Sequence, residues 1–151
     1  MWADTRFNLK LIITVGLPGA GKSTYLAKLG VNAVSSDEVR RMLTDDPTVQ
    51  TIHRRVFAVV RHLIRQRLEL RRPETYVDAT CLTVGERRPY LRIGELYGAE
   101  VEAIFFDTPL DTCLERNRRR ERRVPEEAIR GLARRLSPPT LAEGFSRIFV
   151  V

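Results

Sequence analysis

The stretch Gly16-Leu17-Pro18-Gly19-Ala20-Gly21-Lys22-Ser23 decides the fold of this 151-residue chain. It matches the phosphate-binding pattern GxxxxGK[ST], called the P-loop. Residues 9–15 before it are apolar and β-branched, which predicts a buried strand, and residues 23–29 after it predict a helix that ends at Gly30. A glycine turn without a ligand is the alternative, but the flanking strand and helix favour a site for the phosphates of a nucleotide.

The physical basis of this site is the start of the helix. Its unpaired N–H groups and the positive end of its dipole attract phosphate, and the glycines let successive N–H groups point inward. We expect Lys22 to reach the β- and γ-phosphates and the Ser23 hydroxyl to ligate Mg²⁺. The predicted phosphate-binding residues are Gly16, Pro18, Gly19, Ala20, Gly21, Lys22, Ser23 and Thr24.

Composition indicates a globular chain. Hydrophobic residues make up 43% and charged residues 30%, and no apolar run approaches the ~20 residues of a membrane helix. Residues 1–6 do not lead into a signal peptide, so we expect a cytoplasmic protein with no membrane and no obligate protein partner. Cys81 and Cys113 are expected to be reduced, and His53 and His62 are interpreted as helix residues.

The chain is basic, with a net charge of +7 and a pI of about 10.1. Of its 26 basic residues, 23 are Arg. Codon bias is one explanation of this ratio, and bidentate recognition of phosphate by guanidinium groups is another. The positive charge favours polyanionic ligands, which include nucleotides and nucleic acids.

Strands alternate with helices along the rest of the chain. Further strands are expected at residues 31–35, 75–80, 101–106 and 146–151, and further helices at 36–43, 49–70, 83–97, from 110 onward, and at 125–136. This alternation predicts a three-layer α/β P-loop NTPase fold with a five-stranded parallel sheet. Ligands of such sheets bind at the carboxyl ends of the strands. The P-loop, Asp37, residues 78–80 and residues 107–108 are therefore expected around one crevice.

Two of the expected helices carry more detailed predictions. Ser36 is expected to be the N-cap of the helix that contains Asp37. The helix at residues 49–70 is amphipathic, and its charged stripe is interpreted mainly as a solvated face. Its expected inner face consists of Ile52, Val56, Val59, Leu63 and Leu70.

Three polar side chains are candidates for chemistry next to the phosphates. Asp37 at a helix start can accept the proton of an acceptor hydroxyl, and helix capping is its alternative role. Arg40 shares its helix face and can bind a phosphate, or simply pair with Asp37. Asp78 at the end of a strand can ligate Mg²⁺ through water, hold an acceptor group, or cap a loop.

An arginine-rich segment follows the fourth expected strand. Arg116, Arg119, Arg120 and Arg123 have the i, i+3, i+4 and i+7 spacing of one helical face. Four like charges repel one another there, and an anion docked across them would relieve the repulsion. We therefore expect an arginine-rich helical lid that clamps the triphosphate, with a basic surface helix as the alternative.

Together these segments resemble the polynucleotide 5′-hydroxyl kinases, P-loop enzymes of the phage and bacterial end-healing type that act in nucleic acid repair. The likeness rests on the P-loop, residues 35–40, residues 77–80, residues 116–125 and residues 139–145, and it covers nearly the whole chain. It implies a single kinase domain over 1–151 with a lid at about 116–136. Fused phosphatase, ligase or phosphohydrolase modules are common in that family, and none is expected in this chain. It also implies Mg²⁺ and an NTP donor, either ATP or GTP.

The resemblance also implies roles for individual residues. Asp37 would be the general base for the 5′-OH of RNA or DNA, and Arg40 would hold the adjacent phosphate. The acceptor side would further include Asp78, Thr80 and Val124, the last near the terminal base. The lid is slightly shorter than in the phage enzyme, so Arg119 or Arg122 can take the role of Arg120. The implied catalytic residues are Lys22, Asp37, Arg116 and Arg120, and the implied nucleotide-binding lid residues are Arg116, Arg119 and Arg120.

Two other functions share the same phosphate-binding signal. One is a small-molecule kinase that acts on a sugar, a nucleoside or a nucleotide-sugar. The other is a nucleotide-binding module without transfer activity, which Asp37 and the basic lid argue against, since binding alone needs neither a base nor a clamp.

Overall fold

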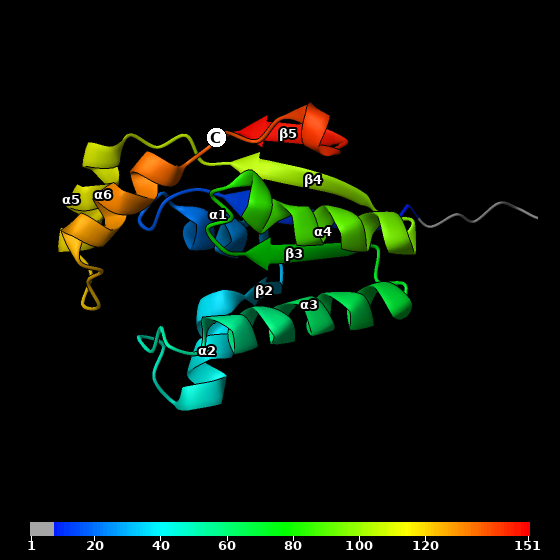
Figure 1. Cartoon of the computed structure of the whole chain (residues 1–151), viewed down its shortest axis with the longest axis horizontal. Coiled ribbons are helices and arrows are strands. Elements are labelled where there is room, and N and C mark those ends of the chain that lie inside the picture. Colours follow the sequence, from blue (N-terminus) through cyan, green and yellow to red (C-terminus); the bar gives the residue numbers. More distant parts are fainter. Residues whose placement is uncertain (1–7) are drawn as a thin grey trace, which may run out of the picture.

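The computed structural model describes residues 8–151, in which five parallel strands form a central sheet (Figure 1). The strands are β1 (Lys10–Val15), β2 (Ala33–Ser35), β3 (Glu74–Asp78), β4 (Glu100–Phe105) and β5 (Arg147–Val150). Their order across the sheet is β2-β3-β1-β4-β5. The expected three-layer α/β fold with a five-stranded parallel sheet is confirmed. Residues 1–6, for which no signal peptide is expected, lie outside the described residues.

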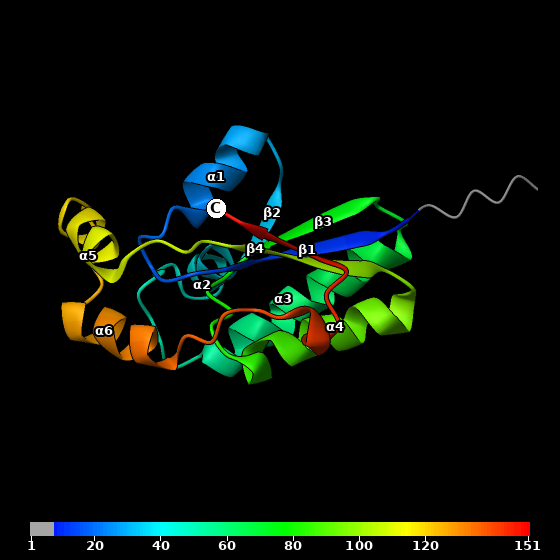
Figure 2. The ribbon, with the colours of Figure 1, turned by 90° about the horizontal axis from the view of Figure 1, so that it is seen from above.

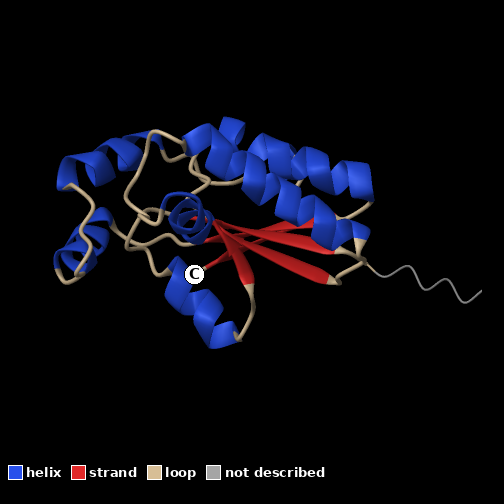
Figure 3. Cartoon of the chain, turned by 90° about the horizontal axis from the view of Figure 1, so that it is seen from below, coloured by secondary structure: helices blue, strands red, loops and turns tan. Residues whose placement is uncertain are grey.

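Helices cover both faces of this sheet and extend past its carboxyl edge. They are α1 (Lys22–Leu29), α2 (Ser36–Thr44), α3 (His53–Glu69), α4 (Val84–Tyr97), α5 (Leu110–Arg118) and α6 (Glu126–Arg135), and a 3-10 turn η1 (Leu141–Glu143) precedes β5. α3 and α4 lie side by side on one face, and α1 lies on the other (Figure 2 and Figure 3). No helix in the described part of the chain is long and apolar enough to cross a membrane.

The two faces of β1 supply two separate hydrophobic cores. Leu11, Ile13 and Val15 are buried beneath α3 and α4, whereas Ile12 packs with Leu17 on the side of α1. Side chains alternate across a strand, so a continuous apolar run fills both cores at once. This burial explains why the segment before the P-loop is apolar at nearly every position.

The parallel register aligns the strand ends at one edge of the sheet. Val15 pairs with Phe105 at the end of β4, and Ser35 pairs with Asp78 at the end of β3. The P-loop, the start of α2 and the segment after β3 therefore leave the sheet next to one another. The crevice expected from the strand order lies at this edge.

The close approach of α4 to the sheet depends on Gly94. A Cβ atom at this position would lie 2.2 Å from Cγ2 of Val101 in β4, a distance that real contacts do not reach. Packing against β4 therefore requires a glycine inside α4, despite the low helix propensity of this residue.

Two detailed predictions about the helices are wrong. The N-cap of α2 is Ser35 rather than Ser36, since the Ser35 hydroxyl accepts a hydrogen bond from the Glu38 N–H at 3.2 Å. In α3 the buried positions are Val56, Val60, Ile64 and Leu68, whereas the expected Leu63 and Leu70 are exposed. The helix carries two adjacent apolar stripes, and packing against the sheet selects the one with strict four-residue spacing.

Candidate active site

The P-loop folds around the side chain of Lys22. Its Nζ donates hydrogen bonds to the carbonyl oxygens of Gly16, at 2.9 Å, and Leu17, at 2.7 Å. Burial lowers the pKa of Lys22 to about 8, and the charges of Asp78 and, more weakly, Asp37 act in the opposite direction. The ammonium group therefore lies within electrostatic range of both candidate carboxylates.

Residues of α5 and of the segment before it contact the P-loop. Gly19 has a φ of 82°, and a Cβ there would lie 2.7 Å from the carbonyl oxygen of Cys113, so only glycine fits. The Arg116 guanidinium donates to the carbonyl of Gly19 at 3.3 Å, and the Thr108 hydroxyl donates to that of Ala20 at 2.9 Å. Arg116 thus lies over the P-loop, and its role in nucleotide binding stays a prediction. The remaining loop residues that we predicted to contact phosphate are Pro18 and Gly21, both half-buried, and Thr24, which is exposed.

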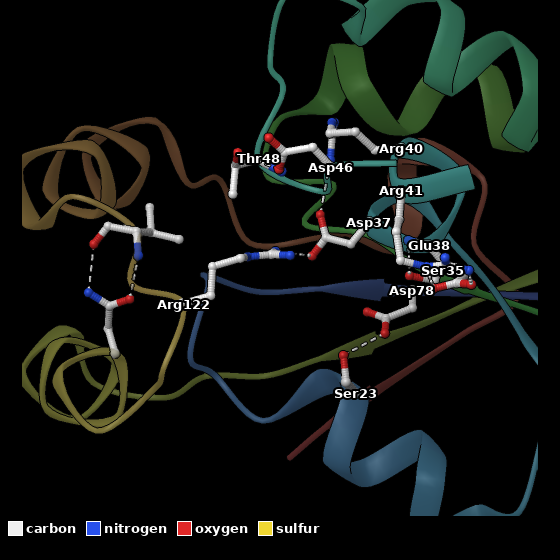
Figure 4. A network of polar contacts seen from close by, with 12 residues as sticks. Ser23, Ser35, Asp37, Glu38, Arg40, Arg41, Asp46, Thr48, Asp78 and Arg122 are labelled. Atoms are coloured by element: carbon white, nitrogen blue, oxygen red, sulfur yellow. Dashed lines mark hydrogen bonds and ion pairs between the residues drawn. The ribbon is translucent and has the colours of Figure 1, made fainter. Parts of the chain in front are cut away.

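Ser23 and Asp78 come together across the crevice (Figure 4). The Ser23 hydroxyl donates a hydrogen bond of 2.7 Å to Oδ2 of Asp78. Hydroxyl and carboxylate oxygens are ligands that suit Mg²⁺, which also keeps waters and binds substrate phosphates. Residues 8–151 contain no cluster of three or more His, Cys, Asp or Glu side chains that could hold a metal. Ser23 and Asp78 would hold a Mg²⁺ ion that arrives with a nucleotide, and the ion would polarise the phosphoryl oxygens.

Thr14 fixes the position of the segment after β3. This buried side chain donates to the carbonyl of Ala79 at 2.7 Å and accepts from the N–H of the same residue at 3.1 Å. Thr80 follows, half-buried at the crevice, and its carbonyl accepts from the Gly16 N–H at 3.0 Å. Thr14 is not among the side chains predicted from the sequence, although a threonine within an apolar strand is a recognisable signal.

Asp37 stands in the first turn of α2 with its carboxylate open to solvent. Its side chain is 62% exposed, and it accepts hydrogen bonds from Arg40 at 3.0 Å and from Arg122 at 3.5 Å. The Arg40 side chain is only 4% exposed, and its Nε has no hydrogen-bond partner among the described residues. The expected pairing of Asp37 and Arg40 on one helix face is therefore present, and it leaves the carboxylate accessible.

His53 extends this contact chain away from Asp37. Its Nδ1 lies 3.4 Å from an Nη atom of Arg40, and its ring packs on Phe57 with a centroid distance of 4.7 Å. Burial and the charge of Arg40 lower the pKa of His53, which favours the neutral form of the ring. The sequence predicts His53 only as a helix residue and gives no sign that this side chain contacts Arg40.

The expected four-arginine helical face does not form. α5 ends at Arg118, so Arg119, Arg120 and Arg123 lie beyond its regular turns. Arg119 is 77% exposed and pairs with Glu115 at 2.7 Å, whereas the Arg123 guanidinium donates to the backbone carbonyl of Arg120. Of these predicted clamp residues, only Arg116 contacts the P-loop.

Asn117 closes the turn that replaces the expected helix. Its buried amide donates to the carbonyl of Val124 at 2.7 Å and accepts from the Val124 N–H at 2.9 Å. The turn carries Arg122 across to Asp37, as Figure 4 shows. Arg122, which we considered only as a substitute for Arg120, is therefore the lid arginine nearest the candidate base.

The two cysteines take no part in this chemistry. Both Cys81 and Cys113 are buried and free within the described chain. Burial raises the pKa of Cys81 to about 12, which keeps its thiol protonated.

A sheet of this order with a P-loop after its central strand defines the kinase-like P-loop α/β fold. Residues 11–139 match a family described as AAA domain, and the chain belongs to that family.

Solved structures with the same fold include proteins of different activity. A chain from a structure named for the Pnkp1/Rnl/Hen1 RNA repair complex is 24% identical, with a TM-score of 0.74, and 89% of this chain is covered. A gluconokinase from Sinorhizobium meliloti 1021 is 18% identical over 97% of this chain, with a TM-score of 0.62. The Mycobacterium tuberculosis APS kinase CysC, in complex with AMPPNP and APS, is 17% identical over 95%, with a TM-score of 0.59.

These structures differ in how much of their own length the likeness covers. The matches span 83% of the gluconokinase chain and 88% of the APS kinase chain. They span 46% of the chain from the RNA repair complex and 43% of a second chain from such a complex. The present chain thus corresponds to about half the length of those two proteins.

Proposed function

We propose that this protein is a polynucleotide kinase, which transfers the γ-phosphate of ATP or GTP to the 5′-OH end of RNA or DNA. The observation that carries the proposal is the position of Asp37. Its exposed carboxylate is held by Arg40 and Arg122, in the same crevice as Lys22 and the Ser23–Asp78 pair. A base, basic side chains and a phosphate cradle are the parts that phosphoryl transfer requires.

The proposed step follows from these positions. Asp37 accepts the proton of the 5′-OH, and the hydroxyl oxygen attacks the γ-phosphorus. A new P–O bond forms to the 5′ oxygen while the bond to the β–γ bridging oxygen breaks, which releases the nucleoside diphosphate. Lys22 and Arg116 lie at the P-loop, where they stabilise the negative charge on the transferred group and the leaving phosphate. Ser23 and Asp78 would hold a Mg²⁺ ion supplied with the donor, and the ion would neutralise charge on the phosphates.

The acceptor side is assigned to the residues that surround Asp37. We propose that Arg40 binds the phosphate adjacent to the reacting nucleoside, and that Thr80 and Val124 line the path of the strand end. Arg40 is buried, so it also fixes the direction of the Asp37 carboxylate. In our proposal Arg122 takes the lid role that was expected for Arg120, because its guanidinium reaches the carboxylate of Asp37.

A small-molecule kinase is the second candidate, and one observation favours it. The gluconokinase and the APS kinase match over more than four-fifths of their own lengths, whereas the RNA repair proteins match over less than half. In that case the acceptor would be a sugar or a sulfated nucleotide. The basic surroundings of Asp37 support an anionic acceptor over a neutral sugar.

The deciding experiment uses Mg²⁺ and ATP or GTP labelled at the γ-phosphate. The acceptors are 5′-OH and 5′-phosphate oligonucleotides of RNA and DNA, gluconate, nucleosides and APS. The proposal requires label on the 5′-OH oligonucleotides and none on the 5′-phosphate forms. Transfer only to the small molecules would establish the second candidate, and nucleotide binding without any transfer would contradict both.

Replacing the candidate base tests the mechanism directly. We expect Asp37→Ala to lower kcat by about 10²-fold or more, because general-base assistance is lost, while affinity for the NTP stays within a few-fold. The matched control is Glu100→Gln, an exposed carboxylate at the opposite end of the sheet. Near-normal turnover of the Asp37 variant would show that another group takes the proton.

A further inference from the structure

A pocket of about 480 Å³ lies next to the proposed acceptor site. It is bounded by α3, α4 and α6 and by the segment that follows β3. Its lining includes the aromatic pair His53 and Phe57, the basic side chains Arg54, Arg61 and Arg135, and Thr80. Of the residues assigned to the acceptor side, Thr80 lines this pocket, whereas Asp37, Arg40 and Val124 do not, so the proposed transfer step leaves the rest of the pocket without a role.

A continuous series of contacts leads from the reacting carboxylate into the pocket. Asp37 accepts a hydrogen bond from Arg40, whose guanidinium lies 3.4 Å from His53, and the His53 ring packs on Phe57. The series thus runs from a base, through a cation, to an aromatic surface. A nucleic acid strand has the same order, because its terminal 5′-OH is followed by the 3′-phosphate of that nucleoside and then by the next base.

We propose that this pocket binds the second nucleotide of the acceptor strand, with its base against Phe57 and its own phosphate at Arg54 or Arg61. The inference rests on the proposed function and extends it beyond the reacting nucleotide. Arg54 and Arg61 are two turns apart on α3, on the side that lines the pocket. Arg135 is already paired with Glu86 at 3.1 Å, so the two α3 arginines are the better candidates for a phosphate.

The size and chemistry of the pocket fit one nucleotide. Its volume lies within the range of pockets that enclose a single small ligand, and longer segments would have to lie outside it. Stacking of a base on an aromatic side chain changes affinity by roughly 5- to 100-fold, and it tolerates every base because each has a π-face. A neutral sugar would leave the cations of the pocket without an anionic partner.

The test compares acceptors that differ only in the second nucleotide. They are a nucleoside 3′-monophosphate, a dinucleotide with a 3′-phosphate, and the same dinucleotide with an abasic second unit. The intact protein should show a kcat/KM for the dinucleotide about 5- to 100-fold above the other two. Phe57→Leu should reduce the ratio of dinucleotide to abasic acceptor toward one, and Arg61→Ala should reduce the salt dependence of KM for the dinucleotide.

Arg65→Ala is the matched control, an exposed arginine one turn further along α3 that does not line the pocket. Its acceptor ratios should equal those of the intact protein. Equal losses on all three acceptors in the Phe57 and Arg61 variants, or an intact protein without preference for the dinucleotide, would overturn the pocket assignment alone. Transfer to gluconate or APS but to no nucleic acid would overturn the proposed function and the pocket assignment with it.

Discussion

Among single side chains, Lys22 is the one whose protonation should respond most directly to a bound nucleotide. Burial lowers its pKa from 10.5 to about 8, so the folded protein binds this proton less tightly than the unfolded chain. The free energy of unfolding therefore rises with pH between about 8 and 10.5, where the unfolded chain still holds the proton. Phosphate groups placed beside the ammonium would favour its charged form and raise the pKa again.

This linkage predicts proton uptake when a nucleotide binds. At pH 8 about half of the Lys22 side chains are uncharged before binding, so we expect uptake of roughly half a proton per bound ATP. Titration calorimetry in two buffers of different ionisation enthalpy measures it, and Lys22→Met serves as the control without the titrating group. Equal binding heats in both buffers would show that the phosphates do not approach this ammonium.

Among the secondary-structure elements, α5 is the one whose end could not be predicted from the residue spacing. The arginine spacing after residue 116 predicts a longer helix. The helix instead ends at Arg118, because Asn117 bonds both backbone groups of Val124 and closes a turn. The hydrogen bonds between Asn117 and Val124 leave no repeat in the sequence, so neither the turn nor the position of Arg122 could be predicted from the spacing of the arginines.

This turn is expected to control the lid arginine. Asn117→Ala removes both hydrogen bonds and leaves two backbone groups of Val124 without partners, which costs about 1–2 kcal/mol. We expect faster hydrogen exchange of the Val124 amide and a lower kcat, because Arg122 loses its fixed position next to Asp37. Arg118→Ala is the control, since its exposed ion pair with Glu126 contributes little. A lower kcat with unchanged amide protection would assign Asn117 a different role.

For the molecule as a whole, the sequence predicted those features that depend on a repeated residue pattern or on residues close together in the chain. Alternating apolar strands and helices fix the parallel sheet, and strand order then brings Ser23 to Asp78 and keeps Asp37 in the same crevice. Arg40 follows from helical spacing alone. The pocket beside His53 and the reach of Arg122 depend instead on how α3, α6 and the lid turn pack, and a linear pattern does not encode those distances.

One buried ion pair links the C-terminal segment to the site. Arg87 in α4 is fully buried and donates two hydrogen bonds to Glu143 of η1, at 2.8 and 3.1 Å, and a third, at 3.0 Å, to the carbonyl of Cys81. Cys81 directly follows Thr80 at the crevice. Burial acts to raise the pKa of Glu143, but hydrogen bonds from Arg87 and from the Thr140 N–H outweigh it and hold that pKa below its usual range.

Breaking this pair should destabilise the protein more than removing it entirely. Glu143→Gln leaves the buried Arg87 charge without a counterion, and we expect a loss of about 3–5 kcal/mol in the free energy of unfolding. The double variant Arg87→Met with Glu143→Gln should lose less, since no uncompensated charge remains. The stabilisation is present above the carboxyl pKa of the unfolded chain and declines as pH falls through the lower folded value. Urea unfolding at pH 7 and pH 4 measures both effects, and a double variant less stable than Glu143→Gln would show that Arg87 stabilises α4 independently of its charge.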